Sequence, residues 1–320
     1  MLFNGSEPLA GDDLLFCALY APGSGDQKQT VWFNGSESKD GLRLETDHFF
    51  SQILPDDSGH YWLAEHSRSC AKSTGLCVFN SRGKLLKSLS VAGKPNLREF
   101  GDSVYAGCEG ENGEAQIYEF SKETLTLVQQ WTVDGFLWGF EKKDGLLYVA
   151  SYLAEENLAV MYVIGENHRA AVELGENFFP TDLAVLDDLI HVTACPVIGG
   201  GGKRIMQLDE SSLEVIREFT LRTSPRQIYS FGSELVVHAL ELGEDKRDKL
   251  ICLDLKTGKQ REHVIPHSHK IRKDVGWLFL ANLKERAVFH WDSEKQKITK
   301  VSSLPDHHNR DLLDFQCRHL

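Results

Sequence analysis

Residues 144–151 read DGLLYVAS, a turn signal followed by strand-forming residues that end in two small ones. The same pattern recurs along the chain, and seven copies align. The fifth place of the aligned run is alanine in six copies and Thr193 in the seventh. The copies are LLFCA at 14–18, HYWLA at 60–64, DSVYA at 102–106, LLYVA at 146–150, LIHVT at 189–193, LVVHA at 235–239 and WLFLA at 277–281.

The spacing of these copies predicts the fold class. Successive fifth places are 46, 42, 44, 43, 46 and 42 residues apart. A period in this range, with strand-type units, is typical of β-blades. The sequence therefore predicts an all-β chain: a seven-bladed β-propeller with four antiparallel strands per blade, formed as a single domain over residues 1–320. The strands of one blade would lie near 135–141, 146–151, 158–164 and 168–174, where turn signals separate them.

The small fifth residue and the end of the chain both fit this fold. Blades lie closest together near their inner strands. A leucine in the fifth place would therefore overpack this region and destabilise the fold by about 1–3 kcal/mol. Residues 310–315, RDLLDF, resemble the expected innermost strand TDLAV at 181–185. We expect the C-terminal strand to close the ring as the innermost strand of the blade formed by residues 11–47, which removes free sheet edges.

Composition excludes several classes of protein. The 320 residues carry a net charge of −12, and 41% of them are hydrophobic, which suffices for a packed core. The first thirty residues lack a signal-peptide pattern, and no apolar run approaches the length of a membrane span. We expect a cytoplasmic monomer with neither nucleic acid nor membrane as a partner. Its seven cysteines are expected to be reduced thiols, with a Cys70–Cys77 disulfide as the alternative.

The repeats resemble the broad superfamily of seven-bladed β-propellers. The residues that carry the resemblance are ICLDLKTGK at 251–259 and VFNSRGK at 78–84. The pattern is similar to that of the quinoprotein-like, lactonase-like and streptogramin-lyase-like groups. Trp291-Asp292 is the one Trp-Asp at the expected place, so the chain does not resemble an ordinary WD40 protein. The active-site motifs of those groups are not recognisable here, and the resemblance assigns no functional residue.

Histidines gather in the loops that would enter three consecutive innermost strands. These loops hold His269, His308 and His48, with Asp306 nearby. Imidazole and carboxylate groups that converge from different blades would suit a divalent transition metal, able to activate a water molecule or polarise a carbonyl. The alternative is that these side chains cap turns and face solvent. A divalent metal is the one cofactor that this pattern suggests.

Other candidates lie on the same expected face. The exits of the second strands offer Glu65, His66, Cys108, Tyr152, Cys195 and Glu241. Of these, His66, Glu241 and Tyr152 are the catalytic candidates. A Cys or His at such a place could act as nucleophile or base, provided that a partner lies within hydrogen-bond reach. The alternative is that these residues are polar groups of the rim or buried thiols. The Gly-rich run 199–202, followed by Lys203 and Arg204, would either cradle an anion or form a plain hairpin loop.

The strand HKIRKD at 269–274 is unusually basic for a strand beside a channel. We predict a site for an anionic ligand lined by Arg226, Lys270, Arg272, Arg310 and Asp182. The alternative is that the basic residues pair with Asp182, Asp306 and Asp311.

Two functions therefore stay open. The first is a binding propeller whose loop-bearing face and channel mouth receive a small polar or anionic ligand or a protein segment. The second is a metal-assisted hydrolase, lyase or isomerase of a small polar or anionic molecule. Whether the chain is an enzyme is left undecided by the sequence.

Overall fold

The computed structural model describes residues 14–22, 28–33, 42–46, 48–65, 75–110, 113–197, 202–231, 234–240, 248–265, 270–274, 277–282, 287–292, 295–303 and 311–319. Within these ranges every regular element is a β-strand, and the strands form seven antiparallel four-stranded sheets. The predicted fold, a seven-bladed β-propeller with four strands per blade, is confirmed. No helix in the described ranges is long and apolar enough to cross a membrane.

Each sheet is written from its innermost strand outward. The first three are β28 (Leu312–His319), β1 (Leu14–Tyr20), β2 (Gln29–Phe33), β3 (Leu42–Thr46); β4 (Phe50–Pro55), β5 (His60–Glu65), β6 (Gly75–Asn80), β7 (Leu85–Ser90); and β8 (Pro95–Phe100), β9 (Ser103–Glu109), β10 (Glu114–Ser121), β11 (Leu127–Asp134).

The other four sheets follow the same order. They are β12 (Phe136–Lys143), β13 (Leu146–Leu153), β14 (Leu158–Ile164), β15 (Arg169–Glu176); β16 (Phe178–Leu186), β17 (Leu189–Pro196), β18 (Arg204–Asp209), β19 (Val215–Thr220); β20 (Ser224–Phe231), β21 (Glu234–Leu240), β22 (Asp248–Asp254), β23 (Gln260–Val264); and β24 (Lys270–Asp274), β25 (Trp277–Asn282), β26 (Ala287–Asp292), β27 (Lys297–Ser303). The strands predicted at 135–141, 146–151, 158–164 and 168–174 correspond to β12–β15.

The chain divides into two compact units, which are described one at a time. The first comprises residues 1–106, 118–129 and 267–320, and the second comprises 107–117 and 130–266. The single domain over residues 1–320 stays a prediction.

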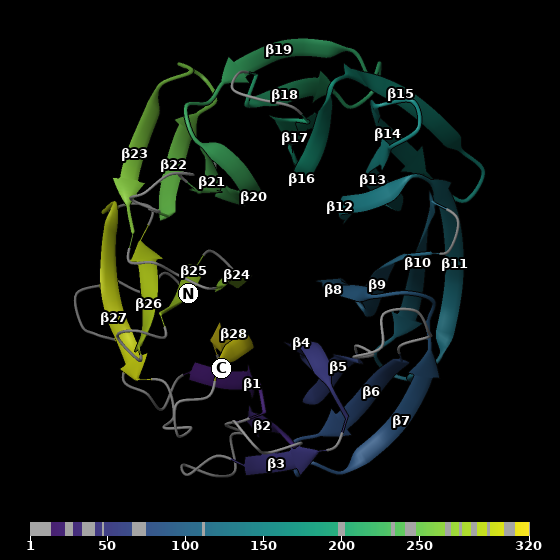
Figure 1. The fold of residues 1–320 in the computed structure, drawn as a ribbon, viewed down its shortest axis with the longest axis vertical. Helices are drawn as coiled ribbons and strands as arrows, with labels where there is room; N and C mark the ends of the chain where they lie inside the picture. The colour runs from purple at the N-terminus through teal and green to yellow at the C-terminus, as the bar shows by residue number, and fades with distance from the viewer. Residues whose placement is uncertain are drawn as a thin grey trace. The chain divides into compact units, whose positions relative to one another are not determined.

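In the first unit, the C-terminal strand completes the N-terminal sheet. β28 pairs antiparallel with β1, from Leu14 opposite His319 to Tyr20 opposite Leu312. Figure 1 shows the two strands, yellow and purple, side by side. The predicted closure is confirmed. Alternate residues of β1 pack in two separate apolar clusters, Phe16 and Ala18 with β25, and Cys17 and Leu19 with β5.

In the second unit, β16 packs between β12 and β20 (Figure 1). Its sheet is covered on both faces, because Val192 belongs to a cluster with Tyr148 of β13, whereas Ile205 belongs to one with Val237 of β21. A sheet buried on both faces explains why the inner strands are nearly continuous apolar runs.

The fifth places of the seven sequence copies are fully buried, as the packing argument requires. Their exposed fraction is 0% at every one of Ala18, Ala64, Ala106, Ala150, Thr193, Ala239 and Ala281. The six cysteines in the described ranges are also buried and form no disulfide there; Cys77 is a thiol, and Cys70 lies outside the described residues.

Candidate functional site

The second unit carries a bulge at the same place in three consecutive innermost strands. In β12, the pairs Leu137–Ser151 and Gly139–Ala150 follow one another, so the residue between Leu137 and Gly139 has no partner on β13. β16 and β20 shift register in the same way. The bulged residues are Trp138, Thr181 and Arg226. Bulges turn a side chain out of the regular pleat and often lie next to functional sites.

All three bulged residues line one cavity of about 610 Å³. Its other walls are largely apolar, with Phe179 at the start of β16, Pro196 at the end of β17, Pro225 in β20 and Leu240 at the end of β21. This size lies in the usual range for small-molecule sites, which combine apolar walls with a few polar groups. The cavity lies where innermost strands begin and second strands end, the face on which the sequence predicted a pocket.

Among the described residues that line this cavity, two are cations and none is acidic. Arg226 is exposed, and Lys203 is half-buried and donates from Nζ to the carbonyl oxygen of Arg222 at 3.3 Å. Within the described ranges neither cation forms an ion pair, whereas the neighbouring Arg204 pairs with Glu218 at 3.2 Å. The charge of Lys203 and Arg226 is thus left for a group that enters the cavity.

Besides the two cations, the polar side chains of the described cavity wall include the hydroxyls of Thr181 and Ser224 and the thiol of Cys195. Cys195 is 7% exposed, and its Sγ donates to the carbonyl of Pro225 at 3.7 Å. Burial raises the pKa of the Cys195 thiol, while a hydrogen bond from Ser224 and the charges of Lys203 and Arg226 act in the opposite direction. Because the net effect is a raised pKa, Cys195 stays protonated at neutral pH and is a poor nucleophile.

Aromatic side chains form one wall of the cavity. The ring centroids of Trp138 and Phe179 lie 4.7 Å apart, with an angle of 30° between the ring planes. The ring of Tyr152 packs edge-on against that of Phe179, with a centroid distance of 6.5 Å. The hydroxyl of Tyr152 donates to Oδ1 of Asn157 at 2.7 Å, and Nδ2 of Asn157 donates to Oδ1 of Asn177 at 2.6 Å. Packing and hydrogen bonds therefore hold the aromatic wall in place without a ligand.

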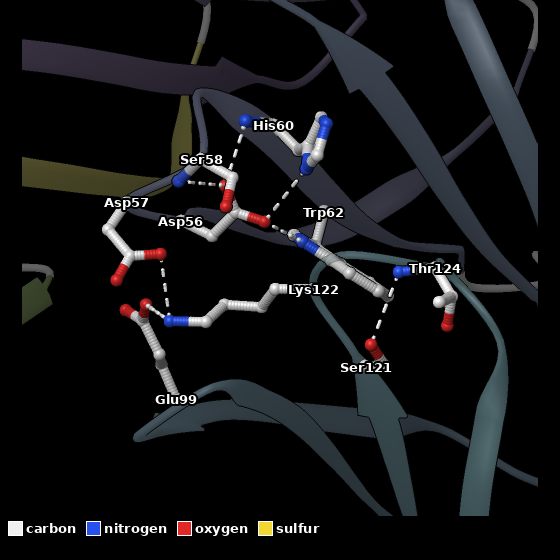
Figure 2. Close-up of polar contacts among 9 residues, drawn as sticks. All are labelled: Asp56, Asp57, Ser58, His60, Trp62, Glu99, Ser121, Lys122 and Thr124. Atoms are coloured by element: carbon white, nitrogen blue, oxygen red, sulfur yellow. Dashed lines mark hydrogen bonds and ion pairs between the residues drawn. The ribbon is translucent and has the colours of Figure 1, made fainter.

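A second polar cluster lies in the first unit, at the turn between β4 and β5. The buried carboxylate of Asp56 accepts hydrogen bonds from the backbone of Ser58 and His60, from Nδ1 of His60 at 3.1 Å and from Nε1 of Trp62 at 2.8 Å (Figure 2). Four donors saturate this carboxylate. Its role is to fix the turn and the buried tryptophan.

The same view shows a buried lysine between two carboxylates (Figure 2). Lys122, 4% exposed, pairs with Asp57 at 2.8 Å and with Glu99 at 3.0 Å. A buried ammonium group requires such pairing. Since its charge is matched within the fold, the Lys122 cluster is structural.

The predicted ligand-binding residues are placed differently from one another. Arg226 lines the cavity. Asp182 is buried, and its Oδ2 accepts the backbone N–H of Ile228 at 3.2 Å. Arg272, in the first unit, donates from Nη2 to the carboxylate of Asp314. Lys270 begins β24 with its side chain undescribed, and Arg310 lies outside the described residues.

The metal and catalytic candidates fall mostly outside the described ranges. His269, His308, Asp306, His66 and Glu241 all lie there. Two candidates are described. His48 is exposed, and its Nδ1 lies 2.7 Å from Oε1 of Glu65. The hydroxyl of Tyr152 is hydrogen-bonded to Asn157. The described residues contain no group of three potential ligands that could hold a metal. The metal site and the metal-assisted enzyme stay predictions.

Sequence reasoning missed most of the cavity wall. Trp138 and Thr181 were not singled out, because the shift of register that leaves a bulged residue without a partner leaves no mark in the pattern of apolar residues. Phe179 was not singled out because it reads as an ordinary apolar strand residue. No shared residue type marks these places in the sequence: pairing with the second strand resumes at Gly139, Asp182 and Gln227, one residue after each bulge.

Comparison with known proteins supports the fold and no closer kinship. No family model and no curated protein matches the chain. Among solved structures, a candidate 6-phosphogluconolactonase from Bacteroides uniformis is similar at 12% identity with a TM-score of 0.64, over 95% of this chain and 99% of that one. Hydrazine synthase of Kuenenia stuttgartiensis matches at 13% identity and 0.62, over 79% of each chain. BamB of Moraxella catarrhalis matches at 10% identity and 0.54, over 89% of this chain and 87% of that one.

Proposed function

We propose that this protein binds a small anionic molecule in the cavity lined by Trp138, Thr181, Lys203 and Arg226. The observation that carries the proposal is the pair of cations in a largely apolar cavity whose described lining residues include no carboxylate. At an effective dielectric constant of about 20, one such charge attracts an anion about 4 Å away by roughly 4 kcal/mol. Two cations together favour a carboxylate or a phosphate monoester over a neutral molecule.

The form of the cavity supports binding of a small molecule. Its wall comes from three neighbouring β-sheets whose strands are fixed by backbone pairing, and two of the lining residues are prolines. A wall of this kind loses little conformational entropy when a ligand enters, which preserves the gain from each contact. Because burial raises the pKa of the Cys195 thiol, this group gives no support to nucleophilic catalysis, and the proposal is confined to binding.

The test measures binding by titration calorimetry with pairs of acids and their uncharged amides. We expect the acids to bind and their amides to bind at least about tenfold more weakly, with an affinity that falls as salt is added. Arg226→Gln and Lys203→Gln should each weaken binding of the acids by about tenfold, because each removes one of the two cations that line the cavity.

A matched control separates this effect from the loss of charge in general. Arg169→Gln removes a cation from β15, where the guanidinium lies over the ring of Tyr162 and outside the cavity wall. This variant should bind the acids as the unaltered protein does. The proposal is wrong if no acid binds, or if acids and amides bind equally well.

A further inference from the structure

We infer that the anion bound in this cavity carries a flat aromatic ring, which stacks on Trp138. The inference rests on the proposed function and specifies its ligand class. Its starting point is the exposure of Trp138: 40% of this large apolar side chain is open, although it lines a cavity. An indole left uncovered in a concave site offers a face on which a planar group can stack.

The orientation of Trp138 is set by the backbone. It is the bulged residue of β12, so its side chain departs from the strand's regular alternation. The next residue, Gly139, allows close approach to β16, because a Cβ there would lie 2.6 Å from Oδ1 of Asp182 and 3.0 Å from its Cα. The strand is thus locked against its neighbour at the residue that follows the tryptophan.

One face of the Trp138 ring is already used, by Phe179 at 4.7 Å and 30°. Phe179 is itself held by Tyr152, whose hydroxyl is bonded to Asn157. A ring inserted against Trp138 would therefore extend an existing aromatic series. The cations Lys203 and Arg226 line the same cavity, so one molecule with a flat ring and an acidic group can use both features.

Three matched probes test this inference: 2-naphthoate, decahydro-2-naphthoate and 2-naphthamide. The two acids have the same charge and carbon skeleton and differ in planarity, whereas the amide keeps the flat ring and lacks the charge. We expect 2-naphthoate to bind about three- to tenfold more tightly than its saturated counterpart, as aromatic stacking predicts.

Variants assign that preference to one ring. Trp138→Leu should abolish the difference between the two acids, and Trp138→Phe should retain part of it. Phe136→Leu is the control, since Phe136 lies on the same strand with a similar exposure of 42% and does not line the cavity. Melting temperatures of the variants establish that each is folded before binding is compared.

The outcomes separate this inference from the proposed function. Equal binding of the two acids, with the amide weaker, would overturn the aromatic inference and leave anion binding standing. A preference for 2-naphthoate that survives in Trp138→Leu would also overturn it. Failure of these two acids to bind, where other acids of the calorimetric series do bind, would overturn the aromatic inference alone. Failure of every acid in that series would overturn both proposals.

Discussion

The side-chain amide of Gln52 in β4 makes two hydrogen bonds to the backbone of one residue, Leu97 in β8. Its Nε2 donates to the carbonyl of Leu97 at 3.0 Å, and its Oε1 accepts from the Leu97 N–H at 2.7 Å. Gln52 follows the bulge of β4, the same position that Asp182 occupies in β16. In β4 and in β16, the side chain after the bulge hydrogen-bonds to backbone groups of the next innermost strand, which a neighbouring strand of the same sheet would otherwise do.

Replacing Gln52 by methionine should destabilise the protein by about 2–3 kcal/mol, because the volume is kept and two backbone groups lose their partner. Thermal or urea unfolding measures the loss. Gln130→Met is the matched control, as Gln130 is exposed and, among the described residues, its side-chain amide bonds to the side chain of Gln116 and to no backbone group. Equal stability of the two variants would mean that the contacts of Gln52 with Leu97 contribute nothing.

Asp314 of β28 gives a second prediction. Its fully buried carboxylate accepts the backbone N–H of Ile53 at 2.9 Å through Oδ2 and the guanidinium of Arg272 through Oδ1. Asp314→Leu should cost about 3–5 kcal/mol, since it leaves a largely buried cation without its partner. The double variant Arg272→Met/Asp314→Leu should recover part of this loss. A double variant at least as unstable as Asp314→Leu would contradict the role assigned to the charge.

His191 predicts how stability depends on pH. Its ring is fully buried, its Nε2 lies 3.0 Å from Nε2 of Gln207, and burial lowers the pKa of His191 from 6.5 to about 4. In the unfolded chain His191 is protonated below about pH 6.5, whereas in the folded chain it is protonated only below about pH 4. Burial of neutral His191 therefore leaves the free energy of unfolding undiminished above pH 6.5. As the pH falls from 6.5 towards 4, the free energy of unfolding decreases by up to about 1.4 kcal/mol per pH unit.

The measurement is urea unfolding at several pH values between 7 and 4.5. His191→Gln removes the titrating group, so its stability should fall less steeply over this range than that of the unaltered protein. His168→Gln, which removes an exposed imidazole, is the control. Identical pH profiles for the unaltered protein and His191→Gln would refute the prediction.

Cys108 and Cys252 should resist alkylation in the folded protein. Both are fully buried, and burial raises the pKa of each thiol to about 12. Thiolate, the reactive form, is then scarce at pH 8. Iodoacetamide at pH 8, followed by peptide mass spectrometry, should label them only after denaturant is added. Rapid labelling of either thiol in protein that remains folded would show that burial does not protect it.

The fold could be predicted from the sequence because each blade needs a small residue at the same place. Ala150 and its six counterparts recur every 42–46 residues, and this spacing identifies the blades even where one strand is poorly marked in the sequence. The closing strand was predictable for a similar reason, since residues 310–315 repeat the pattern of 181–185. Both features are local in sequence and recur.

The cavity was less predictable because it depends on register. Arg226 was identified by its charge, but nothing local distinguishes Trp138 from other apolar residues of its strand. Arg272 shows the same limit. The sequence offered Asp182, Asp306 and Asp311 as alternative partners for the basic residues, and the partner of Arg272 is Asp314. Which carboxylate lies opposite a guanidinium is decided by strand pairing between distant parts of the chain.

The pairing of β1 with β28 has a consequence for synthesis on the ribosome. β1 emerges before the other described strands, and its partner β28 follows only after some 290 further residues. At about 5–20 residues per second, that delay is roughly 15–60 s. During this time one edge of β1 lacks its partner, although neighbouring blades can already pack. We therefore expect the N-terminal sheet, and not the C-terminal one, to be the last to assemble and the one most in need of protection by chaperones.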